Sequence, residues 1–228
     1  MELNIKELLD FFGDRQDFQK GDANAVIAML GEELNASIYK HFRNNNVEIL
    51  PNSVGPGINK GKRLDRWIVD KKNNKLLQCE IKNWAATAIG GRHLKSDASD
   101  EEIKKVVEYY WDRELRDRLS KNAGHPNGVS KVLLKMKPPK EYKTLKRKPL
   151  LIYWMPISLD KKGVNPLSTL LIKNIYRQMD PEFSKLEIFS ASLYLRKLYR
   201  KGRGGKFIDL DMSHLKRRMK ILNRLQNK

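Results

Sequence analysis

Residues 64–84, LDRWIVDKKNNKLLQCEIKNW, hold two apolar segments on either side of a short polar turn. Segments 64–70 and 76–84 have the length and composition of strands, and residues 71–75 have those of a turn. Strands joined by so short a connection pair in antiparallel order. This stretch therefore predicts a β-hairpin within a larger sheet.

The hairpin carries three charged residues that we expect to meet at one end of the sheet. Asp65 begins the first strand, and Glu80 and Lys82 lie in the second. Because side chains alternate along a strand, Glu80 and Lys82 share one face, whereas Ile81 points to the other face and can enter the core. Paired carboxylates suit Mg²⁺, which prefers oxygen ligands and keeps several waters. The main-chain carbonyl of Ile81 is a further candidate ligand, and Lys82 could act on an attacking water or a developing oxyanion.

Helical and strand patterns alternate on both sides of the hairpin. Apolar residues at helical spacing predict a helix over 23–43, and a short strand is expected at 47–50. Beyond the hairpin we expect helices over 101–120, 166–179, 191–201 and 213–226, and strands over 149–156, near 186–190 and over 207–211. The order helix, three strands, helix, strand predicts an α/β fold with a mixed sheet.

The composition narrows the class of protein. The chain of 228 residues has 46 Lys+Arg against 27 Asp+Glu, a formal net charge of +19, and 40% hydrophobic residues. The hydrophobic content is enough for a core, and the excess charge favours a polyanionic partner, nucleic acid first. The chain has no run of about 18 apolar residues, so no membrane span is predicted, and the N-terminal sequence does not resemble a secretory signal. The single cysteine, Cys79, excludes a disulfide framework, so a cytoplasmic location is expected.

The hairpin motif resembles that of the PD-(D/E)xK nuclease superfamily, which includes restriction endonucleases and Holliday-junction resolvases. The resemblance covers about residues 23–155, with Leu64 in place of the leading proline. It implies that Asp65 and Glu80 bind Mg²⁺, for which Mn²⁺ could substitute, and that Lys82 assists catalysis. It also implies a restriction-endonuclease-like fold, with a central four-stranded mixed β-sheet flanked by helices. A basic C-terminal α/β extension would follow this core.

The resemblance further implies an acidic residue on the first helix. Gly31-Glu32-Glu33-Leu34 resembles the corresponding segment of resolvase-like members, and Glu32 is the favoured catalytic residue. Helical projection places Glu32 opposite the apolar stripe through Leu30, Leu34 and Ile38. If the sheet packs against the other side of the helix, Glu33 takes this role. For either residue, a solvated helix face remains the alternative.

The implied function is a metal-dependent DNA nuclease that hydrolyses phosphodiester bonds, with internal cutting expected from the family alone. A catalytically inactive nuclease-like DNA-binding module is the alternative, and a membrane-surface or protein-interaction module is a third. The sequence leaves open whether the protein forms a homodimer, which would supply the two sites that cutting both strands generally needs.

Basic residues concentrate in two segments, 131–148 with eight basic residues and one acid, and 196–228 with twelve and two. Lysines in such segments bind phosphates without reading sequence. The candidate DNA-binding residues are Lys62, Arg63, Arg92, Lys143, Lys146, Arg147 and Arg203. We expect a single domain over 1–228, with a nuclease core over about 22–156 and the basic extension over about 157–228.

Overall fold

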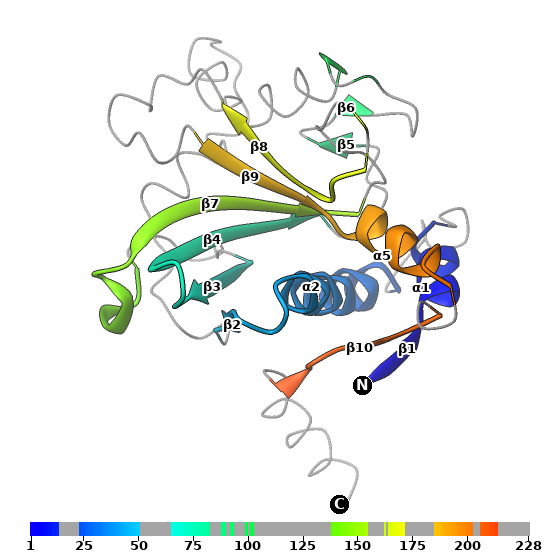
Figure 1. The fold of residues 1–228 in the computed structure, drawn as a ribbon, viewed down its shortest axis with the longest axis horizontal. Coiled ribbons are helices and arrows are strands. Elements are labelled where there is room, and N and C mark those ends of the chain that lie inside the picture. The colour runs from blue at the N-terminus through cyan, green and yellow to red at the C-terminus, as the bar shows by residue number, and fades with distance from the viewer. Residues whose placement is uncertain are drawn as a thin grey trace, which may run out of the picture.

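The computed structural model describes residues 1–13, 23–50, 65–82, 88–89, 92–93, 99, 101–102, 138–154, 162, 164–171, 185–202 and 206–213. Its centre is a six-stranded mixed sheet with the strand order β2-β3-β4-β7-β9-β8 (Figure 1). The six strands are β2 (Glu48–Ile49), β3 (Arg66–Asp70), β4 (Lys75–Lys82), β7 (Lys146–Tyr153), β8 (Leu167–Leu171) and β9 (Lys185–Ser190).

The type of strand pairing changes twice across this sheet, from antiparallel to parallel and back to antiparallel. β2, β3 and β4 pair in antiparallel order, β4, β7 and β9 run parallel, and β8 is antiparallel to β9. The predicted hairpin is β3–β4, and its turn holds Asn74 at a φ of 53°, a left-handed conformation that asparagine tolerates better than most residues. In β7, which lies between two parallel neighbours, Leu150, Leu151 and Ile152 are buried on alternate faces, as expected for a strand in the interior of a sheet.

The mixed α/β class predicted from the sequence is confirmed, but the sheet has six strands where four were predicted. β9 and β8, which belong to the expected C-terminal extension, continue the same sheet. The helix expected over 166–179 is wrong for its first part, because residues 167–171 form β8. A five-residue apolar segment, LSTLL, carries too few residues for periodicity to separate helix from strand, and pairing with β9 decides it.

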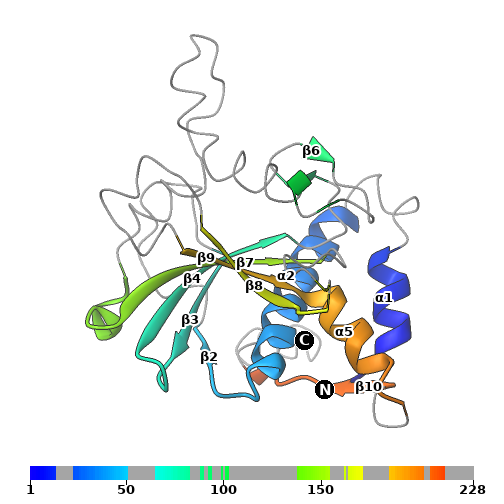
Figure 2. The same ribbon diagram turned by 45° about the horizontal axis from the view of Figure 1, so that its top comes forward.

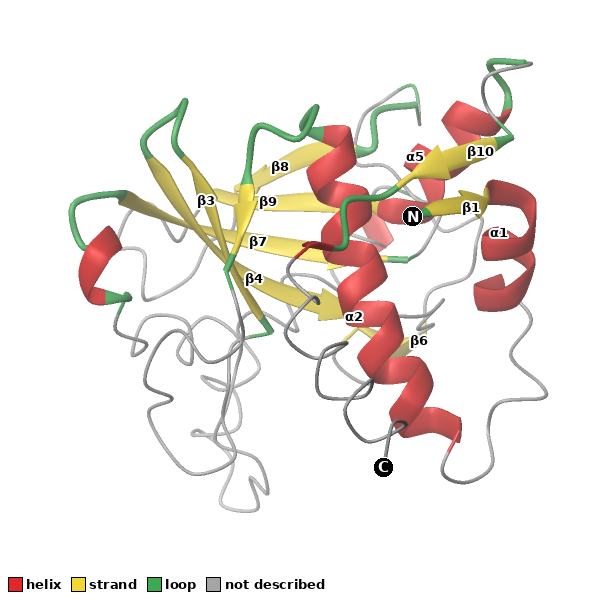
Figure 3. Cartoon of the chain, turned by 90° about the horizontal axis from the view of Figure 1, so that it is seen from below, coloured by secondary structure: helices red, strands yellow, loops and turns green. Residues whose placement is uncertain are grey.

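Helices cover one face of the sheet. α2 (Ala23–Phe42) crosses this face, and α5 (Ala191–Tyr199) and α1 (Ile5–Gly13) pack beside it (Figures 2 and 3). α5 begins at Ser190, whose hydroxyl accepts a hydrogen bond from the Leu193 N–H. The main core lies between these helices and the sheet, with Ile38, Ile68 and Ile152 fully buried. A second cluster lies on the opposite face, around Trp67, Val69 and Leu76.

Five short elements complete the described structure. β1 (Glu2–Asn4) pairs with β10 (Phe207–Asp209) in antiparallel order, which joins the N-terminus to the C-terminal part of the chain. β5 (Ala88–Ile89) and β6 (Arg92–His93) form a two-residue ribbon, and η2 (Lys140–Tyr142) precedes β7. The predicted strand at 207–211 is thus confirmed in part. Most of the helices expected over 101–120 and 213–226 lies outside the described residues.

None of the helices in the described part of the chain is long and apolar enough to cross a membrane.

Candidate active site

The β3–β4 register brings the two predicted carboxylates to the same level of the sheet. Arg66 pairs with Cys79 and Trp67 with Gln78, so continuing the register by one residue places Asp65 across from Glu80. Directly opposite residues of an antiparallel pair share a face. Side-chain alternation along β4 puts Glu80 on the face of Trp67, away from α2. The β3–β4 hairpin that the sequence predicted is therefore present, and it brings Asp65 and Glu80 to the same end of the sheet.

A side-chain hydrogen bond fixes Asp65 at the end of the hairpin. Its Oδ2 accepts from the main-chain N–H of Ile81 at 2.7 Å, just beyond the last paired residues of β3 and β4. The carboxylate thus continues the hydrogen bonding of β4 where β3 has ended. The Ile81 side chain is buried in the core on the α2 side, as the sequence predicted. The backbone bond and the anchored side chain hold this part of β4 in place.

The carboxylates of Asp65 and Glu80 affect the pKa of the buried Cys79 thiol. Burial raises its pKa well above the ordinary value, and the nearby carboxylates of Asp65 and Glu80 raise it further. A thiol held neutral is a poor nucleophile, so Cys79 acts as a packed core residue. The Arg66 guanidinium opposes this effect, so both signs of charge lie near the thiol.

Lys82 occupies the last position of β4, two residues after Glu80. Its register partner on β7 is Tyr153, whose own partner on β9 is Ser190. Tyr153 is buried, and burial raises the pKa of its hydroxyl, which a hydrogen bond to the Ser190 side chain opposes. These three positions form a row at the carboxyl ends of the parallel strands. The sequence alone does not point to Tyr153 or Ser190, because the pairing of β4, β7 and β9 cannot be read from it.

Arg66 links the first helix to the start of β3. Its guanidinium is 1% exposed, pairs through Nη2 with Glu33 Oε1, and lies 3.8 Å through Nη1 from Glu32 Oε2. The same Nη1 donates to the main-chain oxygen of Asp65. A buried cation needs counter-charge, and α2 supplies two carboxylates. Arg66 therefore connects both candidate helix acids to the backbone of Asp65.

The two helix acids differ in depth. Glu33 is 3% exposed and Glu32 is 30% exposed, and both contact Arg66. Glu33, the second choice on sequence, is therefore the more deeply placed of the two. The importance of Arg66 was missed because the strand sequence gives no sign that its side chain pairs with a helix more than 30 residues earlier.

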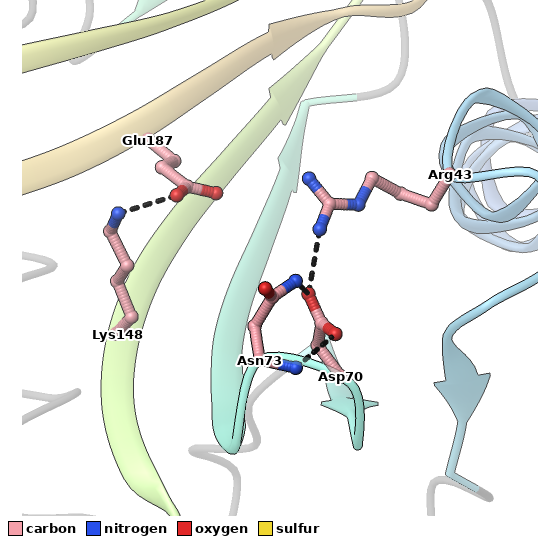
Figure 4. A network of polar contacts seen from close by, with 5 residues as sticks. All are labelled: Arg43, Asp70, Asn73, Lys148 and Glu187. Atoms are coloured by element: carbon pink, nitrogen blue, oxygen red, sulfur yellow. Dashed lines mark hydrogen bonds and ion pairs between the residues drawn. The ribbon is translucent and has the colours of Figure 1, made fainter.

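A second group of buried ion pairs lies on the α2 face, at the other end of the sheet (Figure 4). Arg43 Nη2 is 2.6 Å from Asp70 Oδ2, and Asn73 donates to both carboxylate oxygens of Asp70. On the neighbouring strands, Lys148 Nζ is 2.5 Å from Glu187 Oε1. The first contact ties the end of α2 to the β3–β4 turn, and the second ties β7 to β9. Lys148 therefore has a structural partner, Glu187.

The predicted DNA-binding residues fall in different places. Lys143 and Lys146 are exposed and Arg147 is half-buried, all beside the β3–β4 turn, where the Lys146 N–H donates to the Asn74 main-chain oxygen. Lys146 pairs with Lys75, five residues before Glu80, a separation of about 17 Å along the strand. The structure therefore does not bring these three residues to the carboxylates. Arg92 lies in β6, and the other candidates, Lys62, Arg63 and Arg203, lie outside the described residues.

The donor set at the hairpin end fits a hard divalent cation in chemistry, because two carboxylates, those of Asp65 and Glu80, lie at the same end of β3 and β4. Within the described residues, no group of three or more His, Cys, Asp or Glu side chains is arranged to hold a metal. A cation here would therefore depend on Asp65, Glu80, main-chain oxygen and water. The Ile81 N–H is already bonded to Asp65, which fixes one oxygen of that carboxylate.

Comparisons of the chain with models of protein families, with curated proteins and with solved structures find no match.

Proposed function

We propose that this protein is a metal-dependent DNA nuclease with a PD-(D/E)xK-type site at the end of the β3–β4 hairpin. The observation that carries the proposal is the register that sets Asp65 across from Glu80, with Lys82 two residues further along β4. The strand directions add support: three antiparallel strands are followed by a parallel one, β7, as expected for a restriction-endonuclease-like core. The net charge of +19 suits a polyanionic substrate.

The proposed roles follow from position and charge. Asp65 and Glu80 would hold Mg²⁺, which when bound neutralises charge on a phosphodiester and helps to generate hydroxide. Asp65 is oriented for this by its bond to the Ile81 N–H. Lys82 would orient the attacking water or stabilise the negative charge that develops on the phosphate. Arg66 would act as a positioning residue, since it fixes the Asp65 backbone and not the reacting groups.

A DNA-binding module without catalysis is the second candidate, and one observation favours it. Glu32 and Glu33, the candidate helix acids, both contact the Arg66 guanidinium. A carboxylate that pairs with a buried guanidinium has a structural role. The positive charge of Arg66 also disfavours a metal ion beside it. The site would then consist of Asp65 and Glu80 alone, which weakens metal binding.

One assay separates the two candidates. Supercoiled, linear and single-stranded DNA are incubated with the purified full chain in Mg²⁺, in Mn²⁺ and in EDTA. We expect metal-dependent cleavage by the wild type, with loss in Asp65→Ala, Glu80→Gln and Lys82→Ala. Asp209→Asn, an exposed acid on β10, is the matched control and should cleave normally. Binding without cleavage of any DNA form would support the inactive module, and equal cleavage by the three variants would refute the site.

A further inference from the structure

Two aromatic side chains are exposed where α5 ends and β10 begins. Tyr199, the last residue of α5, is 41% exposed, and Phe207, the first residue of β10, is 51% exposed. The end of α5 and the start of β10 lie close together in all three views (Figures 1–3). Among the described residues, large apolar side chains are otherwise exposed to this degree only at Met1 and Val164. Single exposed apolar side chains are common on protein surfaces, so these two rings gain meaning from what surrounds them.

Basic side chains surround these two rings. Five exposed cations lie in the same segments: Arg196, Lys197, Arg200, Lys201 and Lys206. Residues 191–208 contain no acidic residue. None of the five cations forms an ion pair within the described part of the chain. Cations in the last turn of α5 also stabilise the helix dipole, but Lys201 and Lys206 lie beyond the helix.

The two acids that follow Phe207 on the chain are already paired. Asp209 pairs with the N-terminal ammonium group at 2.8 Å, and Asp211 pairs with Lys40 at 2.6 Å. Between the two aromatic residues, Gly202 has a φ of 90°, and a side chain added there would meet nothing within 4 Å. The space beside Gly202, three residues after Tyr199, is therefore open among the described residues.

We infer that the end of α5 and the start of β10 bind single-stranded nucleic acid, with bases stacked on Tyr199 and Phe207 and phosphates on the surrounding cations. Aromatic rings beside a basic groove are the usual means of holding single strands, because an unpaired base offers its face for stacking. The bases of a duplex are already stacked and cannot reach these rings. This inference does not require catalysis and thus goes beyond the proposed function.

An anionic membrane is a weaker match for this surface. A membrane-bound helix exposes a continuous apolar face. In α5 this face is already used, since Leu195 is buried and Leu198 packs against the main core. Only two separate rings remain exposed, which suits stacking with individual bases.

The surface also lies within reach of the candidate active site. α5 begins at Ser190, in the row that joins Tyr153 to Lys82 at the ends of β9, β7 and β4. Its nine residues span about 13 Å, so the aromatic end is one short helix from this row. A single strand could contact both places at once.

The test measures binding in EDTA, where no metal-dependent cleavage occurs. The probe is a fluorescent oligothymidylate of about 16 nucleotides, compared with a duplex of equal length. We expect the double variant Tyr199→Ala/Phe207→Ala to bind oligothymidylate at least about tenfold more weakly while duplex binding is unchanged. Tyr199→Phe/Phe207→Tyr should bind like the wild type, because both rings are kept. Val164→Ala removes an equally exposed apolar side chain elsewhere and is the matched control.

Three results would overturn the inference: equal oligothymidylate binding by wild type and the double alanine variant, an equal loss on duplex, or binding only to phosphatidylserine vesicles. The outcome is separate from that of the nuclease proposal. A wild type that binds oligothymidylate through these rings and cuts nothing would leave this inference standing alone. Cleavage by the wild type, together with unchanged oligothymidylate binding by the double alanine variant, would support the nuclease proposal and refute the binding inference.

Discussion

The carboxylate of Asp65 accepts a hydrogen bond from the main-chain N–H of Ile81 at 2.7 Å, across the open end of the β3–β4 hairpin. The bond gives one acidic side chain two roles that can be separated. As an acceptor, Asp65 completes the hydrogen bonding of β4, and as an anion it supplies half of the carboxylate pair with Glu80. An amide can serve the first role but not the second.

Asp65→Asn and Asp65→Ala should therefore behave differently. Asparagine keeps an acceptor for the Ile81 N–H, so its unfolding free energy should stay near that of the wild type. Alanine leaves a buried donor unsatisfied and should cost about 1–3 kcal/mol. Both variants should lose metal-dependent cleavage by roughly 100-fold or more, since the charge is gone. Urea denaturation and plasmid cleavage give the two readings, and equal stability of both variants would contradict the role of the hydrogen bond.

The ion pairs of Arg66 allow the contributions of Glu33 and Glu32 to stability to be measured separately. Arg66→Met should lower the unfolding free energy by about 3–5 kcal/mol, because Glu33 is left buried without its cation. The double variant Arg66→Met/Glu33→Gln should recover part of this loss. Glu32→Gln, at a half-exposed position 3.8 Å from Arg66, should change stability by less than about 1 kcal/mol.

The cleavage activity of the same variants decides which helix acid serves the site. If Glu32 acts there, as the family resemblance implies, Glu32→Gln should lose cleavage while its urea midpoint is unchanged. If both acids only hold Arg66, cleavage should follow stability across the series. A Glu32→Gln protein that is as active as the wild type would remove Glu32 from the site.

The sequence could predict the hairpin and the long helix because their signals are local. Alternating and apolar residues of β3 and β4 lie within one short stretch, and the helical spacing in α2 extends over several turns. The placement of Asp65 and Glu80 at one end of the hairpin follows from the short turn alone. β8 was misread because a short edge segment becomes a strand only through its neighbour β9.

The parts that could not be predicted depend on contacts distant in sequence. Arg66 stands beside Asp65 in the chain, yet its partners Glu32 and Glu33 come from a helix whose facing side the pattern left undecided. β1 pairs with β10 across nearly the whole chain, and no local signal indicates that partner. Lys148 looked like part of a basic segment, and only the position of Glu187 on β9 shows that its charge is used internally.

Lys148 and Lys146 provide a matched pair for testing this internal use of charge. Both lie on β7, but Lys148 contacts Glu187 at 2.5 Å and Lys146 is exposed. Lys148→Met should destabilise the fold by about 3–5 kcal/mol, because Glu187 is left buried and unpaired. Lys146→Ala should stay within about 0.5 kcal/mol of the wild type. Thermal and urea unfolding measure both, and similar stability of the two variants would argue against the ion pair.

His41 gives the fold a pH dependence of predictable sign. Its Nδ1 lies 2.8 Å from the Tyr194 hydroxyl oxygen, and burial lowers its pKa below the ordinary value of 6.5. As the pH falls through 6.5, His41 takes up a proton in the unfolded chain before it does so in the folded one. The protein therefore becomes less stable as the pH is lowered. The slope is at most about 1.4 kcal/mol per pH unit and ends below the folded pKa. His41→Gln should remove this contribution, and an unchanged pH profile of urea unfolding would refute it.

The basic residues beside the β3–β4 turn should affect DNA binding without affecting the chemical step. Lys143 and Lys146 are exposed at the end of the sheet opposite Glu80, about 17 Å from it along β4. Replacing both by alanine should weaken duplex binding equally for different sequences and reduce the slope of log K against log salt by up to about 1.8. The rate of cleavage at saturating DNA should stay the same, since neither side chain reaches the carboxylates. Single-turnover cleavage at several salt concentrations measures both quantities. A fall in the saturated rate, with binding unchanged, would show that this end of the sheet closes onto the site when DNA is bound.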